Sequence, residues 1–347
     1  MSTTRKSRKP ARAYSRRRRI DRRSSSRHAR RMHDTTHRDA MQEFADRIVA
    51  ELENGVKPWV RPWDPEKAGG PQAPFNPVTG RRYHGINVLI LGMDMRAFAS
   101  GDPRWMTYQQ AQEKGWQVRK GEKSTTIFFT KRYEVEDEAA ENGKKAVNVF
   151  RHYAVFHASQ IDRVPAYKAP SVEEAPWTRP EAADIILKNS GAVIRIGGDR
   201  AFYSSVTDHI QLPPEHAFRG PPEYAATALH ELGHWTGHST RLNRDMRARF
   251  GSASYAMEEL RAELASAFVA SELGIPTDIP QHASYIADWI KPLKDDKREI
   301  FRAAADAQKI VDMILGFHPE YAARIEIEPA TPVRAARRDD EPTMKPA

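Results

Sequence analysis

The chain has 347 residues, of which 39% are apolar and none is cysteine, and its formal net charge is +9. This length exceeds one compact domain and predicts two buried cores. The lack of cysteine excludes disulfides, thiolate metal sites and cysteine nucleophiles, so any metal must be held by His, Asp or Glu. No stretch approaches the roughly 18 consecutive apolar residues of a membrane helix. We therefore expect a soluble, cytoplasmic protein without membrane contact.

The positive charge is concentrated in residues 1–38, which contain 15 Lys or Arg and two Asp, whereas the rest of the chain has a net charge of −4. Such a segment buries little and repels itself, so we expect it to be disordered and to contact a polyanion, with nucleic acid as the first candidate. A passive extension or a targeting peptide is the alternative. An amphipathic targeting helix would need apolar residues that this stretch lacks.

A first domain is expected over residues 39–162, with an α+β fold. Apolar residues recur at helical spacing in DAMQEFADRIVAELENG, and Gly55 ends that helix. A loop rich in Pro and Gly follows, then an apolar helix near residues 86–98 and a short helix near 108–114. Two β-rich stretches, STTIFFTKRYEV and AVNVFRHYAVFH, complete the domain.

Four prolines between residues 163 and 180 predict a linker there. The second domain is expected over residues 181–318, as a helix and short strands followed by helices near 221–238, 255–273, 283–290 and 293–315. Its strand AFYSSVTDHIQLP closely precedes the first of these later helices and is a candidate edge for an extended peptide. Residues 319–347, rich in Pro, Ala and charge, are expected to be a flexible tail.

The segment HELGHWTGH, residues 230–238, contains the most specific chemical signal of the chain. Two prolines before it suit the first turn of a helix. On that helix His230 and His234 lie one turn apart, about 6 Å along the axis, with both imidazoles on one face, as binding of one zinc ion requires. Glu231 lies beside them, where its carboxylate can act as a general base. The alternative is a pair of surface histidines.

A third ligand is expected from the helix YAMEELRAELASAFVASELG. Glu263 falls within its apolar stripe, where an ionised carboxylate is expensive to bury without a cation. We therefore expect His230, His234 and Glu263 to bind Zn²⁺, with water at the fourth position. Glu259, one turn earlier, is expected to orient one of the histidine ligands without binding the metal itself.

Other polar residues near the motif have simpler interpretations. Glu258 can pair with Arg261 on the outer face of its helix. On a continuous helix His238 would lie about 12 Å from His230, too far to share a zinc ion. A closed structural site would need a fourth protein ligand, and the sequence offers no clear one. An open, catalytic geometry is therefore expected.

The first domain interleaves aromatic and basic residues, a pattern that suits stacking on unpaired bases beside a phosphate backbone. Packing is the alternative for tryptophans in a Pro-rich stretch. The candidate DNA-binding residues are Trp59, Trp63, Arg81, Arg82, Tyr83, Asn87, Trp105, Lys120 and Lys123.

Several segments together resemble the ArdC antirestriction family of plasmids and phages, over about residues 39–318. They are ELENGVKPWVRPW, NPVTGRRYHGINVLIL, WMTYQQAQEKGWQVRKGEKSTTIFF, LHELGHWTGHSTRLNRD and EELRAELASAFVASELGI. The resemblance implies an N-terminal domain that binds single-stranded DNA and a C-terminal zincin-type metallopeptidase domain, in proteins that protect incoming DNA. The arginine-rich tail is not part of the shared pattern.

The sequence thus favours a single-stranded-DNA-binding protein with a zinc-dependent peptidase module, whose substrate is a restriction-system or DNA-bound protein. The alternative is a non-enzymatic DNA coat with a structural or vestigial zinc site. A nuclease or primase is less favoured, because phosphoryl transfer usually needs carboxylates clustered for magnesium.

Overall fold

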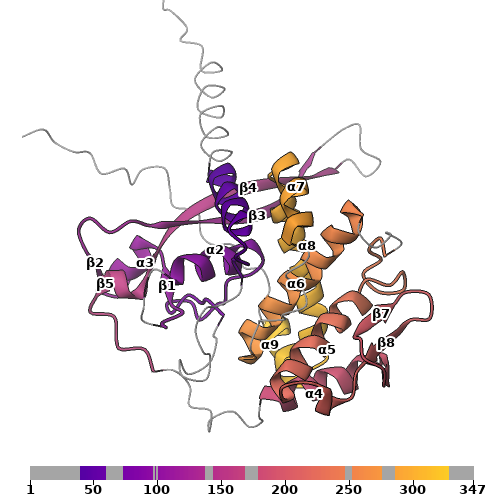
Figure 1. Cartoon of the computed structure of the whole chain (residues 1–347). Helices are drawn as coiled ribbons and strands as arrows, with labels where there is room; N and C mark the ends of the chain where they lie inside the picture. Colours follow the sequence, from indigo (N-terminus) through magenta and orange to yellow (C-terminus); the bar gives the residue numbers. More distant parts are fainter. Residues whose placement is uncertain are drawn as a thin grey trace, which may run out of the picture. The chain divides into compact units, whose positions relative to one another are not determined.

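The computed structural model describes residues 40–59, 73–96, 98, 101–136, 144–168, 179–246, 252–275 and 286–327 (Figure 1). The basic tail and most of the expected linker lie outside these residues. Residues 41–347 form one compact unit. We call residues 40–168 the N-terminal half and residues 179–327 the C-terminal half. None of the described helices is long and apolar enough to cross a membrane.

The N-terminal half is α+β, as predicted. It begins with a helix over residues 40–53. The elements that follow are α2 (Ile86–Met95), β1 (Trp105–Met106), α3 (Tyr108–Glu113), β2 (Gln117–Val118), β3 (Thr125–Glu136), β4 (Lys144–His157), the 3-10 turn η1 (Ala158–Gln160) and β5 (Ile161–Asp162). Strands β1, β4 and β3 form one antiparallel sheet in that order, and β2 pairs with β5.

Helix α2 covers the sheet because its apolar residues face β3. The core between them contains Tyr83, Leu91, Met95, Trp105, Ile127 and Val155. The side chain of Asn87 donates to the Phe128 carbonyl at 2.7 Å and accepts from the Phe128 amide at 2.8 Å. These two bonds fix α2 to the strand. Helix α3 begins in a capping box, in which Thr107 and Gln110 satisfy each other's backbone amides.

The C-terminal half places a small sheet against a group of helices. Its elements are α4 (Arg179–Ser190), β6 (Val193–Ile196), β7 (Phe202–Ser204), β8 (His209–Leu212), the 3-10 turn η3 (Glu215–Ala217), α5 (Pro221–Trp235), α6 (Ala253–Leu273), α7 (Ile286–Asp295), α8 (Glu299–Gly316) and α9 (Pro319–Ile327). In the sheet, β8 lies between β6, to which it is parallel, and β7, to which it is antiparallel.

Helices α5 and α6 pack against each other, and α6 also packs on α7 and α8. Strands β7 and β8 contact α5. Helix α6 begins where the Ser252 hydroxyl accepts from the Tyr255 amide, and it ends at Gly274, whose φ of 73° suits glycine. Helix α9 occupies the first nine residues of the segment expected to be a flexible tail.

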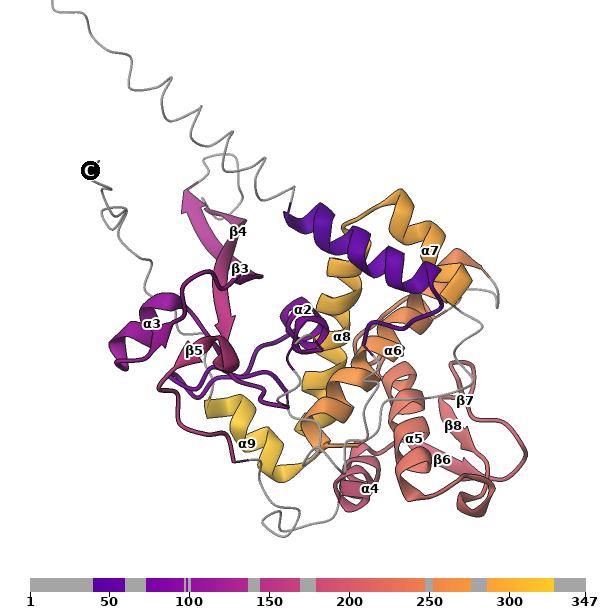
Figure 2. The ribbon, with the colours of Figure 1, turned by 60° about the vertical axis from the view of Figure 1, so that its left-hand side comes forward.

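The first helix, residues 40–53, lies beside α7 and α8 rather than on the sheet of its own half (Figure 2). Phe44 packs edge-on against Phe301 with ring centroids 6.1 Å apart. Trp59, six residues beyond this helix, packs on Trp289 of α7 at 5.5 Å. The two halves therefore share a core.

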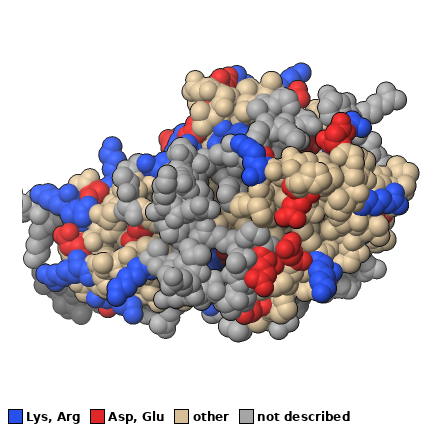
Figure 3. Space-filling model, turned by 60° about the horizontal axis from the view of Figure 1, so that its bottom comes forward, with Lys and Arg blue, Asp and Glu red and all other residues tan. Residues whose placement is uncertain are grey.

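Lysine and arginine side chains gather on one side of the surface, where α3, β2 and β5 lie (Figure 3). Exposed members of this group include Lys114, Lys120, Lys123 and Arg163. Arg119 also lies there and pairs with Glu122 and Asp162. The acidic residues in the same view are more frequent toward the opposite side.

Candidate metal centre

Two imidazoles face each other on α5. His230 and His234 are 2% and 7% exposed, and their Nε2 atoms lie 3.1 Å apart. The rings are nearly perpendicular, with an interplanar angle of 82°. This arrangement follows from the one-turn spacing on a helix whose face packs on α6. The alternative of surface histidines is wrong.

Helix α6 brings the carboxylate of Glu259 to the same point. Its oxygens lie 3.7 Å from His230 Nε2 and 3.5 Å from His234 Nε2. One ligand atom from each of the three residues falls within 4.8 Å of the others, and all three side chains are buried. Two imidazoles and one carboxylate form a donor set suited to a divalent metal such as zinc.

The structure thus brings Glu259, and not the expected Glu263, to the two Nε2 atoms. The Glu263 carboxylate contacts the ammonium of Lys57 at 2.9 Å and lies 3.9 Å from Nδ1 of His230, the ring nitrogen that faces away from His234. Glu263 does lie buried in the apolar stripe, as predicted, and a cation does compensate it. That cation is Lys57, a residue of the N-terminal half.

His234 also has a carboxylate next to its other ring nitrogen, Nδ1. Glu258 lies 3.4 Å from His234 Nδ1, and it accepts from the Arg244 guanidinium at 2.8 Å. The expected pairing of Glu258 with Arg261 is wrong, since Glu258 is 6% exposed and faces α5. Arg261 pairs instead with Glu299 of α8 and with Asp306.

The charges of these groups are mutually dependent. Burial disfavours the protonated ring of His234, but the carboxylates of Glu259 and Glu258 outweigh this effect and raise its pKa well above the ordinary value. Burial likewise disfavours ionised Glu259, but the imidazoles of His234 and His230 lower the pKa of that carboxyl below its ordinary range. The space between these side chains therefore favours a positive charge, which a metal ion supplies on displacing the protons.

Glu231, the predicted general base, is 7% exposed on α5, and its charge acts on His234. His238 lies beyond the end of α5 and contacts Thr240. The helix ends at Trp235 because the chain turns back at Thr236, so the expected end at residue 238 is three residues too late.

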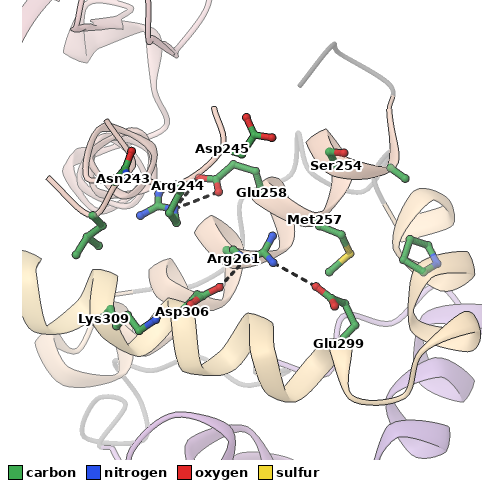
Figure 4. A pocket seen from close by; sticks show the side chains of 13 residues that line it. Asn243, Arg244, Asp245, Ser254, Met257, Glu258, Arg261, Glu299, Asp306 and Lys309 are labelled. Carbon is green, nitrogen blue, oxygen red and sulfur yellow. Dashed lines mark hydrogen bonds and ion pairs between the residues drawn. The ribbon is translucent and has the colours of Figure 1, made fainter. Parts of the chain in front are cut away.

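A cavity of about 660 Å³ lies behind the Glu258 side of this centre (Figure 4). Its walls come from the segment after α5 and from α6, α7 and α8. The charged side chains in the walls bind one another: Arg244 pairs with Glu258, and Arg261 pairs with Glu299 and Asp306. These pairs fix the outer wall of the metal centre.

Four of the nine expected DNA-binding residues occupy the interior. Trp105 is fully buried, and Trp59 and Tyr83 are each 7% exposed, so no base can stack on their rings in this conformation. The Tyr83 hydroxyl donates to the Trp105 carbonyl at 3.1 Å. The buried Asn87 holds β3 as described above. The two tryptophans are packed in the interior, as the packing alternative predicts, and Tyr83 and Asn87 are buried as well.

The remaining candidates differ in exposure. Arg82 forms an ion pair with Glu272 of α6, and Arg81 is half-buried. Lys120 and Lys123 are exposed. Trp63 lies outside the described residues. Tyr108, at the start of α3, is exposed as well.

Comparison with known protein families divides the chain in two. Residues 38–156 match the N-terminal domain of the anti-restriction factor ArdC, and residues 181–306 match a zincin-like metallopeptidase. The two matches correspond to the N-terminal and C-terminal halves and confirm the two-domain α+β organisation.

Relatives of two kinds are similar to this chain in sequence. An uncharacterized protein y4eC of Sinorhizobium fredii is 37% identical over 281 residues, which cover 79% of this chain and 91% of the relative. DNA primase TraC of Escherichia coli is 44% identical over 331 residues, which cover 88% of this chain and 30% of the relative. A second TraC of the same species is 46% identical over 20% of its length. The chain thus spans less than a third of the TraC proteins.

The solved structures of the antirestriction ArdC protein from plasmid R388 have the same architecture. The metal-free structure is 36% identical, with a TM-score of 0.67, and the match covers 81% of this chain and 98% of that one. The Mn(II)-bound structure has a TM-score of 0.65 at the same identity. On its sequence and its fold, the chain belongs to the ArdC antirestriction family.

Proposed function

We propose that this protein binds single-stranded DNA through its N-terminal half and hydrolyses peptide bonds at a zinc ion held by its C-terminal half, protecting incoming plasmid or phage DNA. The observation that carries the proposal is the cluster of His230, His234 and Glu259. Three protein donors on two packed helices leave a position for water or a substrate carbonyl, as catalytic zinc sites require.

The residues around this cluster suit amide hydrolysis. A bound divalent metal supplies a Lewis acid that polarises a carbonyl and acidifies water. Glu231 accepts the proton that the attacking water loses, and then returns it to the leaving amine. Glu258 and Glu263 lie at the Nδ1 atoms of the two histidines and keep each Nε2 directed at the metal. An extended peptide fits along the edge of β7, which lies against α5.

Zinc is proposed over other divalent ions because two imidazoles and one carboxylate are a common catalytic zinc set. The relative with bound Mn(II) makes manganese the competitor to test. Elemental analysis of protein purified without added metal distinguishes the two. If manganese is found in place of zinc, the proposed ion changes, but the proposed ligand residues stay the same.

DNA binding is proposed for the basic surface around α3, β2 and β5. Lys120 and Lys123 are exposed there, and the ring of Tyr108, 44% exposed, offers a stacking face. The tail of residues 1–38 adds further positive charge.

The salt dependence of binding tests this surface. Each DNA-contacting lysine that is lost should reduce the slope of log DNA affinity against log salt concentration by about 0.7. We expect Lys120→Gln and Lys123→Gln to do so, and the matched control Lys188→Gln on α4 to have no effect.

The variant Glu231→Gln tests the enzymatic part. It should retain metal content and DNA affinity, because Glu231 is not among the metal ligands, but its peptide cleavage should fall by about 100-fold or more. Glu223→Gln, on the first turn of the same helix, is the control. Protection of transferred DNA against restriction is measured in parallel. If Glu231→Gln loses cleavage and still protects, the protein acts as a DNA coat, and peptidase activity is not how it protects.

A further inference from the structure

The two carboxylates behind the metal-binding histidines each have a cation. For Glu258 the cation is Arg244, which comes from the segment after α5, in the same half. For Glu263 it is Lys57, which is 206 residues away in the chain and belongs to the N-terminal half. The zincin-like match begins at residue 181 and does not include this lysine.

The Lys57 side chain is enclosed. Its Nζ lies 2.9 Å from Glu263 Oε1, and the two side chains are 9% and 3% exposed. The other oxygen, Oε2, is the one near His230 Nδ1. One carboxylate therefore connects the ammonium on one side with the imidazole on the other.

The backbone that carries Lys57 is fixed at the following residues. The carbonyl of Pro58 accepts from the Arg96 guanidinium at 2.7 Å. The next ring, Trp59, packs on Trp289 of α7. Since both anchors lie within two residues of Lys57, the position of the ammonium is set by contacts of this segment with Arg96 and with α7.

We propose that Lys57 is a positioning residue of the metal centre, supplied by the DNA-binding half. Its ammonium holds the Glu263 carboxylate beside His230, with Oε2 3.9 Å from Nδ1, so that the negative charge favours a proton on Nδ1 and leaves Nε2 for the metal. A buried carboxylate is costly without a compensating charge. Without Lys57, the Glu263 carboxylate loses the cation that compensates its charge, and we expect it to hold its place beside the ring less firmly. The inference rests on the metal centre proposed above.

A consequence is that the zincin-like domain is incomplete by itself. Its metal affinity depends on a residue whose place is set by the helix over residues 40–53 and the loop after it. A change in the DNA-binding half that moves this loop also changes the metal site. The two halves are then coupled through one ion pair.

The test measures zinc affinity of the full chain by competition with a chelator, for the wild type and for Lys57→Met, Lys57→Arg and Arg82→Met. Loss of a residue that supports a ligand from behind typically costs 10–100-fold in metal affinity, so we expect a loss of about tenfold in Lys57→Met. Lys57→Arg keeps the cation and should restore affinity to within about threefold of the wild type. Arg82→Met is the matched control, because Arg82 also crosses from the N-terminal half to α6, where it pairs with Glu272, three turns beyond the metal ligands.

Unchanged or tighter zinc binding by Lys57→Met would overturn the inference while leaving the metal centre intact. An equal loss in Arg82→Met would also overturn it, since the effect would then come from a loosened contact between the halves. A wild type that binds no divalent metal would contradict the proposed function itself. Should Lys57→Met not fold, Lys57→Gln is compared instead, and in a Glu263→Gln background the substitution of Lys57 should have no further effect on affinity.

Discussion

The two nitrogens of each metal-binding histidine have separate partners. In His230 and His234 the Nε2 atoms converge on Glu259, whereas the Nδ1 atoms face Glu263 and Glu258. A carboxylate at Nδ1 fixes the tautomer in which Nε2 is free to bind a metal. The position of a carboxylate relative to the ring thus decides whether it binds the metal or supports a ligand.

Substitutions of the two α6 carboxylates should therefore differ in severity. We expect Glu259→Ala to leave only two protein ligands and to release the metal on dialysis. Glu263→Gln keeps all three ligands and should weaken binding by about 10–100-fold. Elemental analysis and chelator competition measure both effects. Retention of one metal per chain in Glu259→Ala would return the ligand role to Glu263.

The sequence could identify the helix of the candidate metal centre, but not which α6 carboxylate meets the two Nε2 atoms. The spacing of His230 and His234 fixes their geometry on any helix. Glu259 and Glu263 are one turn apart on the same face of α6, so both satisfy the sequence pattern equally. The difference between them is the contact of Glu263 with Lys57, a residue too distant in the chain for local periodicity to reveal.

His157 provides a pH-dependent contribution to stability outside the metal centre. Its ring stacks on Phe98 at 4.5 Å, its Nε2–H donates to the Asp102 carbonyl at 2.6 Å, and Nδ1 accepts from the Ser159 amide. Burial lowers the pKa of His157 despite the nearby carbonyl and carboxylate of Asp102. A second proton on Nδ1 would also abolish the bond from Ser159.

A lowered pKa in the folded state means that the unfolded chain binds more protons as the pH falls below the ordinary histidine value of about 6.5. The stability from neutral His157 is then complete above that pH and is lost progressively below it. We expect the unfolding free energy to decrease between pH 7.5 and 5.5 by more in the wild type than in His157→Gln. Urea denaturation of the metal-free proteins measures the difference, and equal decreases would contradict the assignment.

At the scale of elements, the turn after α5 links the metal helix to its surroundings. The chain reverses so that the Arg244 amide donates to the Gly237 carbonyl, and the Arg244 guanidinium donates to the Gly233 carbonyl at 2.7 Å and to Glu258. In the same turn Arg241 stacks on Trp235, 3.7 Å from the ring centroid. This turn places the Arg244 guanidinium against Glu258, and so fixes the carboxylate that contacts His234.

Gly237 is required where this turn is tightest. An added Cβ would lie 2.5 Å from Met246 Sδ, 2.9 Å from Arg244 Nη2 and 3.0 Å from the His234 carbonyl. Met246 can move, but Arg244 is held by its ion pair. We expect Gly237→Ala to lower the unfolding free energy by about 1–3 kcal/mol.

The zinc affinity of Gly237→Ala should fall as well, because Arg244 shifts. The control is Gly92→Ala in α2, where an added Cβ meets nothing within 4 Å and alanine favours the helix. Thermal unfolding and chelator competition of both variants provide the comparison. A Gly237→Ala protein as stable as the wild type would show that the turn accommodates the methyl group.

Elements with local start and stop signals were predictable from sequence. The prolines at the start of α5, the short helix α3 and the strands β3 and β4 all lie where the sequence predicts them. The end of α5 was missed because the turn depends on Arg244, seven residues after Gly237. Helix α9 was missed because a charged, Ala-rich segment has the composition of a flexible tail until a helix contacts it.

For the molecule as a whole, the boundary between family domains is not a boundary of packing. The helix over residues 40–53 belongs to the N-terminal match, yet its Phe44 contacts Phe301 of α8. The ring of Phe301 also contacts Phe128 of β3, with the two centroids 5.4 Å apart. Ion pairs of Lys294 with Glu53 and of Lys297 with Asp46 flank this contact. An amphipathic pattern predicts that a helix face is buried, but it does not identify the surface that buries it.

The shared core predicts that the two halves unfold together. Phe44 is 5% exposed, and Phe44→Ala should lower the unfolding free energy by about 3–5 kcal/mol, since no neighbouring side chain fills the cavity without disturbing Phe301. The loss should affect both halves equally, so that calorimetry gives one transition at a lower temperature. Val206→Ala, at a residue 93% exposed, should change stability by no more than about 0.5 kcal/mol. Two separate unfolding transitions would show that the halves are independent, if Phe44→Ala leaves unchanged the temperature of the transition that metal stabilises. With a single transition, we expect residues 39–162 expressed alone to expose the faces of Phe44 and Trp59 and not to reach their native packing.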